Sequence, residues 1–276
     1  MPEERKTTIG FVILTWNSEK FIGNCLESVF ALEQVEPYAV VVDNGSTDGT
    51  CSLLEGFTKE YPERFTLIRY SENRGTTVTR NIGIQQVSAW SPDYYCILDS
   101  DTQINDAAFC ALIEEMEIHP EYGLIGPSMV NSRGVPQVSA RCFPTLHEKL
   151  VKVAPVAALQ KLGEKMELQQ PSTPGLPSYP VDYLISACWL LRPEIFEKVG
   201  LLDEKIFYAP EDAEYCIRVW KAGYQVAWCP RAEIIHEWQR LSRKKWISKL
   251  NWEHIKGLAH MFRKHGYLFR SDNIKR

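Results

Sequence analysis

The sequence lacks the features that define several large classes of protein. No apolar run reaches the ~20 residues that a helix needs to span a bilayer, and the N-terminus has no apolar core and cleavage site of a signal peptide. The eight cysteines include no Cys-x-x-Cys pair, which argues against a zinc site and against a secreted disulfide framework. We therefore expect a cytoplasmic protein with reduced thiols.

Two common nucleotide-binding motifs are also missing. No Gly-x-Gly-x-x-Gly follows the first apolar run, and no Walker A loop with its glycines and lysine occurs anywhere in the chain. These absences argue against a dehydrogenase and against a P-loop NTPase.

The composition is that of a globular protein, but its charge is unevenly distributed. The 276 residues are 45% hydrophobic and 24% charged, which excludes bulk disorder. The formal net charge is -4, yet residues 237–276 contain eleven Lys and Arg against three Asp and Glu. An acidic body with a basic tail argues against nucleic-acid binding and favours a tail that meets an anionic surface.

The first hundred residues alternate short apolar runs with amphipathic stretches, which predicts a mostly parallel sheet with helices on both faces. After Asp101 the pattern becomes less regular, and the six prolines within 143–180 predict a long, partly irregular segment. A terminal helix is expected over 242–265. The other expected strands and helices are strands at 9–15, 38–42, 65–70, 94–98, 123–127, 135–140, 181–191 and 225–229, and helices at 18–31, 77–87, 106–118 and 211–222, with Ser18 as the N-cap of the first helix.

Polar clusters follow four consecutive predicted strands. Ligands of open α/β sheets bind beyond the carboxyl ends of the strands, so four such clusters predict a polar rim around one ligand site. They are Thr15-Trp16-Asn17, Asp43-Asn44, Asn73-Arg74-Gly75 and Asp99-Ser100-Asp101.

The most informative cluster is the last one, because Asp99 and Asp101 leave a buried strand two residues apart. Carboxylates in this arrangement can share a hard divalent cation with bound phosphates. A strand-end turn with Asp101 as a helix cap is the alternative. A phosphatase would place its Asp-x-Asp after the first strand rather than the fourth. Asp43, also at a strand end, either accepts hydrogen bonds from a base or ribose or begins an Asx turn.

Two further sites come later in the chain. Glu211 and Asp212 begin a predicted helix, where acidic residues are favoured by the helix dipole but where one could also serve as a general base. His236 ends a β-like run and is either a metal ligand or a structural histidine.

Taken in order, these motifs resemble family 2 glycosyltransferases with the GT-A fold, and most closely the rhamnosyltransferase-like branch that builds bacterial surface polysaccharides. The resemblance covers residues 7–240. The matching segments are Val12-Ile-Leu-Thr-Trp-Asn-Ser18, Val42-Asp-Asn-Gly-Ser-Thr-Asp48, Glu72-Asn-Arg-Gly-Thr-Thr-Val-Thr-Arg-Asn81, Leu98-Asp-Ser-Asp101, Arg141-Cys-Phe-Pro-Thr145, Ser186-Ala-Cys-Trp-Leu-Leu-Arg192, Gly200-Leu-Leu-Asp203, Glu211-Asp-Ala-Glu-Tyr-Cys-Ile-Arg218 and His236.

The resemblance implies a role for each matched position. Mg²⁺ or Mn²⁺ would be held by Asp99, Asp101 and His236, and Asp212 would be the base of an inverting transfer. Glu211 and Trp189 would contact the acceptor. The donor, a dTDP- or UDP-sugar that could carry rhamnose, would be bound by Thr15, Asn17, Asp43, Arg74, Asp99 and Ser100.

The chain departs from this branch at Ser100 and Ala213, where the branch often has Asp, so Glu214 is expected to take the role of the second acid. The resemblance also implies a GT-A domain over 1–237, with a nucleotide-binding half at 7–102 and an acceptor-binding half at 103–237, followed by a helical tail. A catalytically degenerate nucleotide-sugar-binding subunit and a sugar nucleotidyltransferase are the competing functions.

The tail, 238–276, interleaves aromatic and basic residues, a composition that suits a membrane interface. We expect it to bring the protein to the inner face of the membrane, where a lipid-linked acceptor would be found, although the acceptor could also be a free saccharide. Packing of the tail on the domain or in a homodimer is the alternative. The residues concerned are Trp238, Trp246, Ile247, Leu250 and Trp252, with Arg243, Lys244, Lys245 and Lys249.

Overall fold

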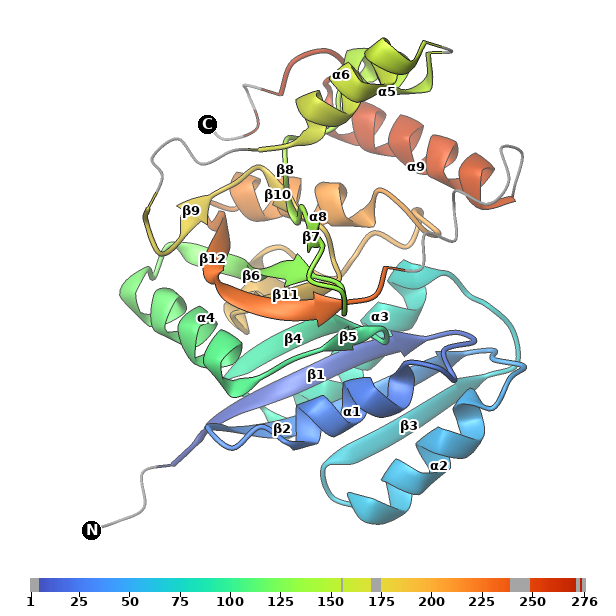
Figure 1. Cartoon of the computed structure of the whole chain (residues 1–276), viewed down its shortest axis with the longest axis vertical. Coiled ribbons are helices and arrows are strands. Elements are labelled where there is room, and N and C mark those ends of the chain that lie inside the picture. Colours follow the sequence, from blue (N-terminus) through green and yellow to red (C-terminus); the bar gives the residue numbers. More distant parts are fainter. Residues whose placement is uncertain (1–4, 155, 170–174, 239–248, 272–273, 275–276) are drawn as a thin grey trace.

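The computed structural model describes residues 5–154, 156–169, 175–238, 249–271 and 274. Its first part alternates strands and helices as the sequence predicts, and Figure 1 shows these elements at one end of the molecule. These elements are β1 (Thr7–Thr15), α1 (Ile22–Phe30), β2 (Val35–Asn44), α2 (Thr50–Glu60), β3 (Phe65–Tyr70), α3 (Thr76–Val87), a 3₁₀ turn (Ser88–Trp90) and β4 (Tyr94–Asp99).

The second part extends the same sheet and adds helices at the other end (Figure 1). Its elements are β5 (Thr102–Gln103), α4 (Asp106–Ile118), β6 (Tyr122–Val130), β7 (Pro136–Gln137), β8 (Ala140–Arg141), α5 (Leu146–Val153), α6 (Ala157–Glu167), β9 (Tyr179–Pro180), β10 (Tyr183–Leu184), β11 (Cys188–Leu191), α7 (Glu194–Lys198), α8 (Glu211–Lys221), β12 (Gln225–His236) and α9 (Lys249–His265).

The central sheet has the order β3-β2-β1-β4-β11-β6-β12-β5. The first four strands are parallel, so their carboxyl ends share one edge; there Thr15 lies beside Asp43, and Leu14 beside Asp99. β11 runs antiparallel to both β4 and β6, and β12 runs parallel to β6. The mostly parallel α/β sheet predicted from the sequence is therefore confirmed for the first half and becomes mixed in the second.

Each face of the sheet has its own hydrophobic core, because alternate side chains of a strand point to opposite faces. On one face Phe11 packs with α1 and α4. On the other face Val12, one residue later, packs with α3. The same core continues to Trp189 of β11 and Tyr215 of α8. Two covered faces explain why the strands are apolar at nearly every position.

One local prediction is wrong. Ser18 does not cap the first helix: α1 begins at Ile22, and the Ser18 hydroxyl lies 2.9 Å from that of Ser100. The segment predicted to be partly irregular, 143–180, contains two helices that the sequence analysis did not place, α5 and α6. Thr145 caps α5 by accepting a hydrogen bond from the Glu148 amide. A threonine at this position is a usual N-cap signal, but the surrounding prolines obscure it in the sequence.

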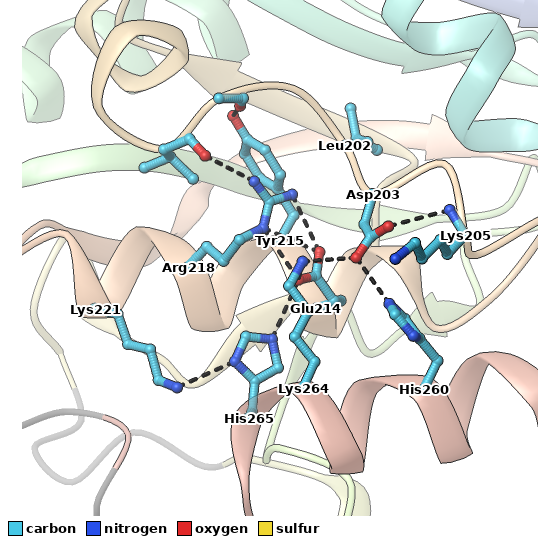
Figure 2. A network of polar contacts seen from close by, with 12 residues as sticks. Leu202, Asp203, Lys205, Glu214, Tyr215, Arg218, Lys221, His260, Lys264 and His265 are labelled. Carbon is cyan, nitrogen blue, oxygen red and sulfur yellow. Dashed lines mark hydrogen bonds and ion pairs between the residues drawn. The ribbon is translucent and has the colours of Figure 1, made fainter.

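A buried network of charges joins α9 to α8, as Figure 2 shows. The carboxylate of Glu214, which is 1% exposed, lies 2.7 Å from Lys264 Nζ, 3.1 Å from His265 Nε2 and 3.0 Å from Arg218 Nε. Lys264 also reaches Asp203, which lies 2.9 Å from His260. Ion pairs that are shielded from water lock the orientation of α9 on the body.

This network predicts a pH-dependent stability. Burial alone would raise the pKa of Glu214, but His265, Arg218 and Lys264 lower it to about 2. A carboxylate with a depressed pKa stabilises the fold above its unfolded pKa and loses that contribution as pH falls toward its folded pKa. Glu214→Gln should therefore lower the free energy of unfolding by about 3 kcal/mol at pH 7, and the difference should shrink as urea melts are repeated below about pH 4.5.

Glu55→Gln is the matched control, because Glu55 pairs with Arg69 on the surface and both side chains are at least half exposed. An exposed pair contributes at most about 1 kcal/mol, so this variant should unfold nearly as the parent does. Equal losses in the two variants would contradict the role given to the buried network.

Candidate active site

The site lies at the carboxyl edge of the parallel strands, where residues from β1, β4, α3, α8 and β12 line a cavity of about 370 Å³. A larger, open hollow of about 590 Å³ lies around Thr7 and Tyr94, at the opposite ends of β1 and β4, and none of the acids predicted to act is among its lining residues. The predicted site residues that line the first cavity are Asp99, Ser100, Asp101, Glu211, Asp212 and His236.

Asp99, Asp101 and His236 come together as one group, with ligand atoms that all lie within 4.8 Å of one another. His236 Nε2 is 3.3 Å from Asp101 Oδ1, and its Nδ1 is 2.6 Å from Gln137 Oε1. Because an amide oxygen only accepts, Nδ1 carries the proton and Nε2 faces the carboxylates. Two carboxylates and an anchored imidazole are a donor set that fits Mn²⁺ or Mg²⁺.

The tertiary fold brings His236 to this group from 135 positions along the chain. β12 ends beside β5, and the register places His236 opposite Thr102, one residue after Asp101. Gln137 arrives on β7, which pairs with β6. The sequence shows neither pairing, because β5 and β7 are only two residues long.

Arg80 is the buried centre of the site and a residue that the sequence analysis did not single out. Its Nη2 donates to Asp99 Oδ1 at 2.7 Å, and its Nη1 donates to Glu211 Oε1 at 3.1 Å and to Ser186 Oγ at 2.7 Å. The guanidinium thus ties the Asp99 carboxylate to the start of α8. One feature of the sequence could have pointed to Arg80: it is a basic residue among the apolar and small residues of α3 that pack on the sheet.

Glu211 and Asp212 lie at the start of α8 with perturbed pKa values. Burial and the adjacent charge of Asp212 raise the pKa of Glu211 to about 8, against the opposing effects of Arg80 and Ser186. Burial also raises the pKa of Asp212, although its Oδ1 accepts a hydrogen bond from the Ala213 amide at 2.7 Å. A carboxylate with a raised pKa is a stronger base, which suits Asp212 for proton transfer.

Three residues predicted to bind the donor base, Thr15, Asn17 and Asp43, adjoin residues that line the cavity but are not among the lining residues themselves. Asp43 Oδ2 accepts a hydrogen bond from the Ser46 amide, whereas Asp43 Oδ1 and Thr15 Oγ1 are buried without a hydrogen-bond partner in the described chain. Asn17 has a φ of 51° and accepts a hydrogen bond from the Thr47 amide, which ties two loops together. Orphaned buried acceptors are costly, so a ligand that donates to them would be stabilised.

Of three other predicted site residues, Ser100 lines the cavity, whereas Arg74 and Trp189 do not. The Arg74 guanidinium instead stacks 4.2 Å from the centre of the Tyr70 ring, and Arg74 is not among the lining residues. Trp189 is fully buried, donates from its indole to the Leu184 carbonyl and packs on Tyr215, so it has no surface to offer an acceptor. This corrects the prediction that Trp189 contacts the acceptor.

Glu214 is also placed away from the cavity. It was expected to take the role of the second acid, but its carboxylate is paired with Arg218, His265 and Lys264 in the network that holds α9. Its side chain points toward α9, as Figure 2 shows, and Glu214 is not among the residues that line the cavity.

Comparison with known proteins identifies the family. The model of glycosyl transferase family 2 matches residues 11–200. The N-acetylglucosaminyl-diphospho-decaprenol L-rhamnosyltransferase of Mycobacterium tuberculosis (strain ATCC 25618 / H37Rv) is 27% identical over 237 residues, 82% of this chain and 74% of that protein. The poly-beta-1,6-N-acetyl-D-glucosamine synthase of Staphylococcus epidermidis is 31% identical over 42% of this chain and 27% of its own length.

Two solved structures share the fold. GalNAc-T7, crystallised with UDP, GalNAc and Mn²⁺, superposes with a TM-score of 0.70 at 16% identity, over 95% of this chain and 48% of that one. The mannosyltransferase PcManGT of Pyrobaculum calidifontis, crystallised with GDP-Man and Mn²⁺, has a TM-score of 0.63 at 15% identity, over 99% and 68% of the two chains. The predicted GT-A fold is thereby confirmed, and the chain belongs to glycosyl transferase family 2.

Proposed function

We propose that this protein is a metal-dependent, inverting glycosyltransferase of surface polysaccharide synthesis that uses a nucleotide diphosphate sugar. The observation that carries the proposal is one cavity holding both the Asp99, Asp101 and His236 group and the carboxylate of Asp212. The donor is activated at its anomeric carbon, and the deprotonated acceptor hydroxyl must attack that same carbon. The Asp99, Asp101 and His236 group and the Asp212 carboxylate must therefore share a cavity.

The donor is inferred to be a dTDP- or UDP-sugar. Asp43 and Thr15 each have one orphaned acceptor at the strand edge, and a pyrimidine or ribose offers N–H and O–H donors to both. The likeness to a rhamnosyltransferase supports rhamnose as the sugar and a lipid-linked saccharide as the acceptor.

Different residues of the chain would neutralise the leaving group, accept the proton and keep the site aligned. A divalent cation held by Asp99, Asp101 and His236 would offset the charge of the departing diphosphate. Asp212 takes the proton of the acceptor hydroxyl as that oxygen attacks the anomeric carbon. The attack comes from the side opposite the departing diphosphate, so the configuration of the anomeric carbon is inverted. Arg80 keeps Asp99 and Glu211 at a fixed separation, so the two halves of the reaction stay aligned.

Contact with a membrane through 238–276 is part of the proposal, because a lipid-linked acceptor resides there. Trp238 and Leu250 of the predicted motif line the cavity, and Trp252 is exposed. Arg243, Lys244, Lys245, Trp246 and Ile247, like the side chain of Lys249, lie outside the described residues. Among the described helices, none is both long and apolar enough to cross a bilayer.

Thermal unfolding with nucleotides tests the donor site. A ligand that binds only the native state raises the unfolding midpoint, so UDP or dTDP with Mn²⁺ should stabilise the protein by several degrees, and EDTA should abolish most of the shift. GDP and CDP are the comparison nucleotides, and Asp101→Asn should lose the Mn²⁺-dependent part. No shift with any nucleotide would contradict the donor site, whereas a shift without any transfer activity would favour a catalytically degenerate subunit.

A further inference from the structure

Large apolar side chains that face solvent are concentrated on one part of the molecule. Sixteen such side chains are exposed among the described residues, and nine of them lie on α5, α6, α9 and the residues that adjoin these helices. Figure 1 shows the three helices together at the end of the molecule opposite α2. The nine are Leu150, Val156, Leu159, Leu162, Leu168, Trp252, Ile255, Leu268 and Phe269. We call this part of the surface, residues 146–168 and 249–271, the helical cap.

The apolar side chains of α6 are held outward by the packing of its other face. Gly163 lies so close to α5 that an added Cβ would be 2.8 Å from the Lys152 backbone nitrogen. Glu167, one turn later on the same face, is ion-paired with Arg141 and Lys149. Leu159 and Leu162 therefore remain in solvent, at 40% and 48% exposure.

The packing of α9 is equally constrained. Gly257 faces the body, where an added Cβ would be 2.2 Å from the Ala209 carbonyl oxygen, and Met261 is fully buried. The network around Glu214 fixes the same face. Trp252 and Ile255 consequently point away from the body, with 59% and 56% of their surfaces exposed.

The helices form one continuous surface rather than separate patches. The Leu146 amide at the start of α5 donates to the Leu268 carbonyl at 2.7 Å, so the residues after α9 lie against α5. Burial, with the charges of Lys149 and Lys152 on α5, lowers the pKa of His254 on α9 to about 4. α5 thus packs on α6 and lies close to α9 and to the residues that follow it.

The exposed charges of the helical cap are almost all positive. Its acids Glu148 and Glu167 are buried, and Glu253 pairs with Lys256, so Glu164 is the one exposed acid among its described residues. Besides Lys264, which pairs with Asp203 and Glu214, five exposed basic side chains surround the apolar ones: Lys161, Lys165, Lys256, Arg263 and Arg270.

We propose that the helical cap docks on the surface of an anionic lipid bilayer. Apolar side chains within a basic border match the headgroup layer of such a membrane, where each Lys or Arg adds electrostatic attraction and each buried side chain adds apolar transfer. A second copy of the chain fits less well, because lysine is depleted from protein interfaces and like charges would meet. The inference deepens the proposed function and adds α5 and α6 to the predicted membrane contact of the tail.

Docking in this orientation also positions the active site. Leu250, in the first turn of α9, lines the cavity, so the bilayer would lie beside the cavity rather than on the far side of the sheet. An acceptor sugar attached to a membrane lipid could then reach Asp212 without leaving the headgroup region.

Vesicle sedimentation with the full chain tests the proposal. The protein should sediment with vesicles that contain one third phosphatidylglycerol and much less with pure phosphatidylcholine, and added salt should weaken the binding. Leu159→Ser/Leu162→Ser should lower the partition coefficient about tenfold, and Lys161→Glu/Lys165→Glu should lower it by at least as much. Leu53→Ser, on the exposed face of α2, is the matched control and should bind as the parent does.

The results separate this proposal from the proposed function, because nucleotide stabilisation of the same variants reports on the donor site alone. Unchanged nucleotide shifts with lost vesicle binding would support docking through the cap. The proposal is overturned if the parent ignores anionic vesicles, or if the leucine variants bind them fully. It is also overturned if light scattering shows a dimer that the leucine variants dissociate, since the cap would then be a contact between two copies.

Discussion

Replacing Asp212 by Asn should lower kcat by about 10²–10⁴-fold, the usual contribution of a general base. The substitution keeps the size of the side chain and its hydrogen bond from the Ala213 amide but removes the proton acceptor. Transfer should be assayed with the nucleotide sugar selected by thermal stabilisation. Glu211→Gln, its neighbour at the start of α8, should cost less in kcat, because Glu211 is engaged by Arg80 and Ser186.

The pH profile provides a second reading of the same residue. A base acts only when it is deprotonated, and burial raises the pKa of Asp212. Activity of the parent should therefore fall as pH drops through that raised value, at a higher pH than an exposed aspartate would give.

Stabilisation of Asp212→Asn by nucleotide and Mn²⁺ should equal that of the parent, because Asp212 is not placed on the donor. A variant that binds nucleotide normally and keeps kcat within threefold of the parent would exclude Asp212 as the base. A variant that loses nucleotide binding would instead indicate a misfolded cavity.

Replacing Arg80 by Met should lower the free energy of unfolding by about 1–3 kcal/mol, the expected cost of leaving buried acceptors without their donor. Arg80 is 2% exposed, and its loss would strand Asp99 and Glu211 together with the Ser186 carbonyl, which now accepts from Arg80 Nη2 at 3.1 Å. Urea denaturation at pH 7 measures the change. Arg64→Met is the control, because Arg64 is only partly buried and stacks on the Phe30 and Tyr61 rings.

Metal dependence separates the structural role of Arg80 from its role at the site. With Arg80 gone, Asp99 retains the charge of Asp101 beside it but loses its cationic partner. Mn²⁺ should then restore part of the stability of Arg80→Met, whereas it should not restore Arg80→Met/Asp101→Asn. A variant as stable as the parent would contradict the central position given to Arg80.

The sequence predicted the elements whose signals are local. The alternation of apolar runs and amphipathic stretches, with polar residues after each strand, was enough for β1 to β4 and for the site at their carboxyl edge. Helix 106–118 was predicted with its bounds, and in the structure the Asn105 side chain caps its start by accepting a hydrogen bond from the Ala108 amide. The position of Asp99 and Asp101 followed directly, since both lie within three residues of the end of a buried strand.

Other features depend on contacts between distant segments. α5 and α6 were missed because the prolines around them dominate the local pattern, while the ion pairs of Glu167 with Arg141 and Lys149 that hold them in place are tertiary. Trp189 was expected at the acceptor because the family resemblance implied it, but its neighbours in space, Tyr215 and Leu184, place it in the core.

The sequence by itself determined that this is an α/β enzyme of the family 2 type, with its acids at strand ends and a basic tail. The family resemblance implied that His236 joins Asp101. The tertiary structure alone decided that Gln137 holds His236 there, that Arg80 links the two halves of the site and that the apolar faces of α6 and α9 share one surface. The physical reason is range: helical and strand periodicity act over a few residues, whereas burial, ion pairing and metal-ligand geometry depend on which distant segments the fold brings within a few ångströms.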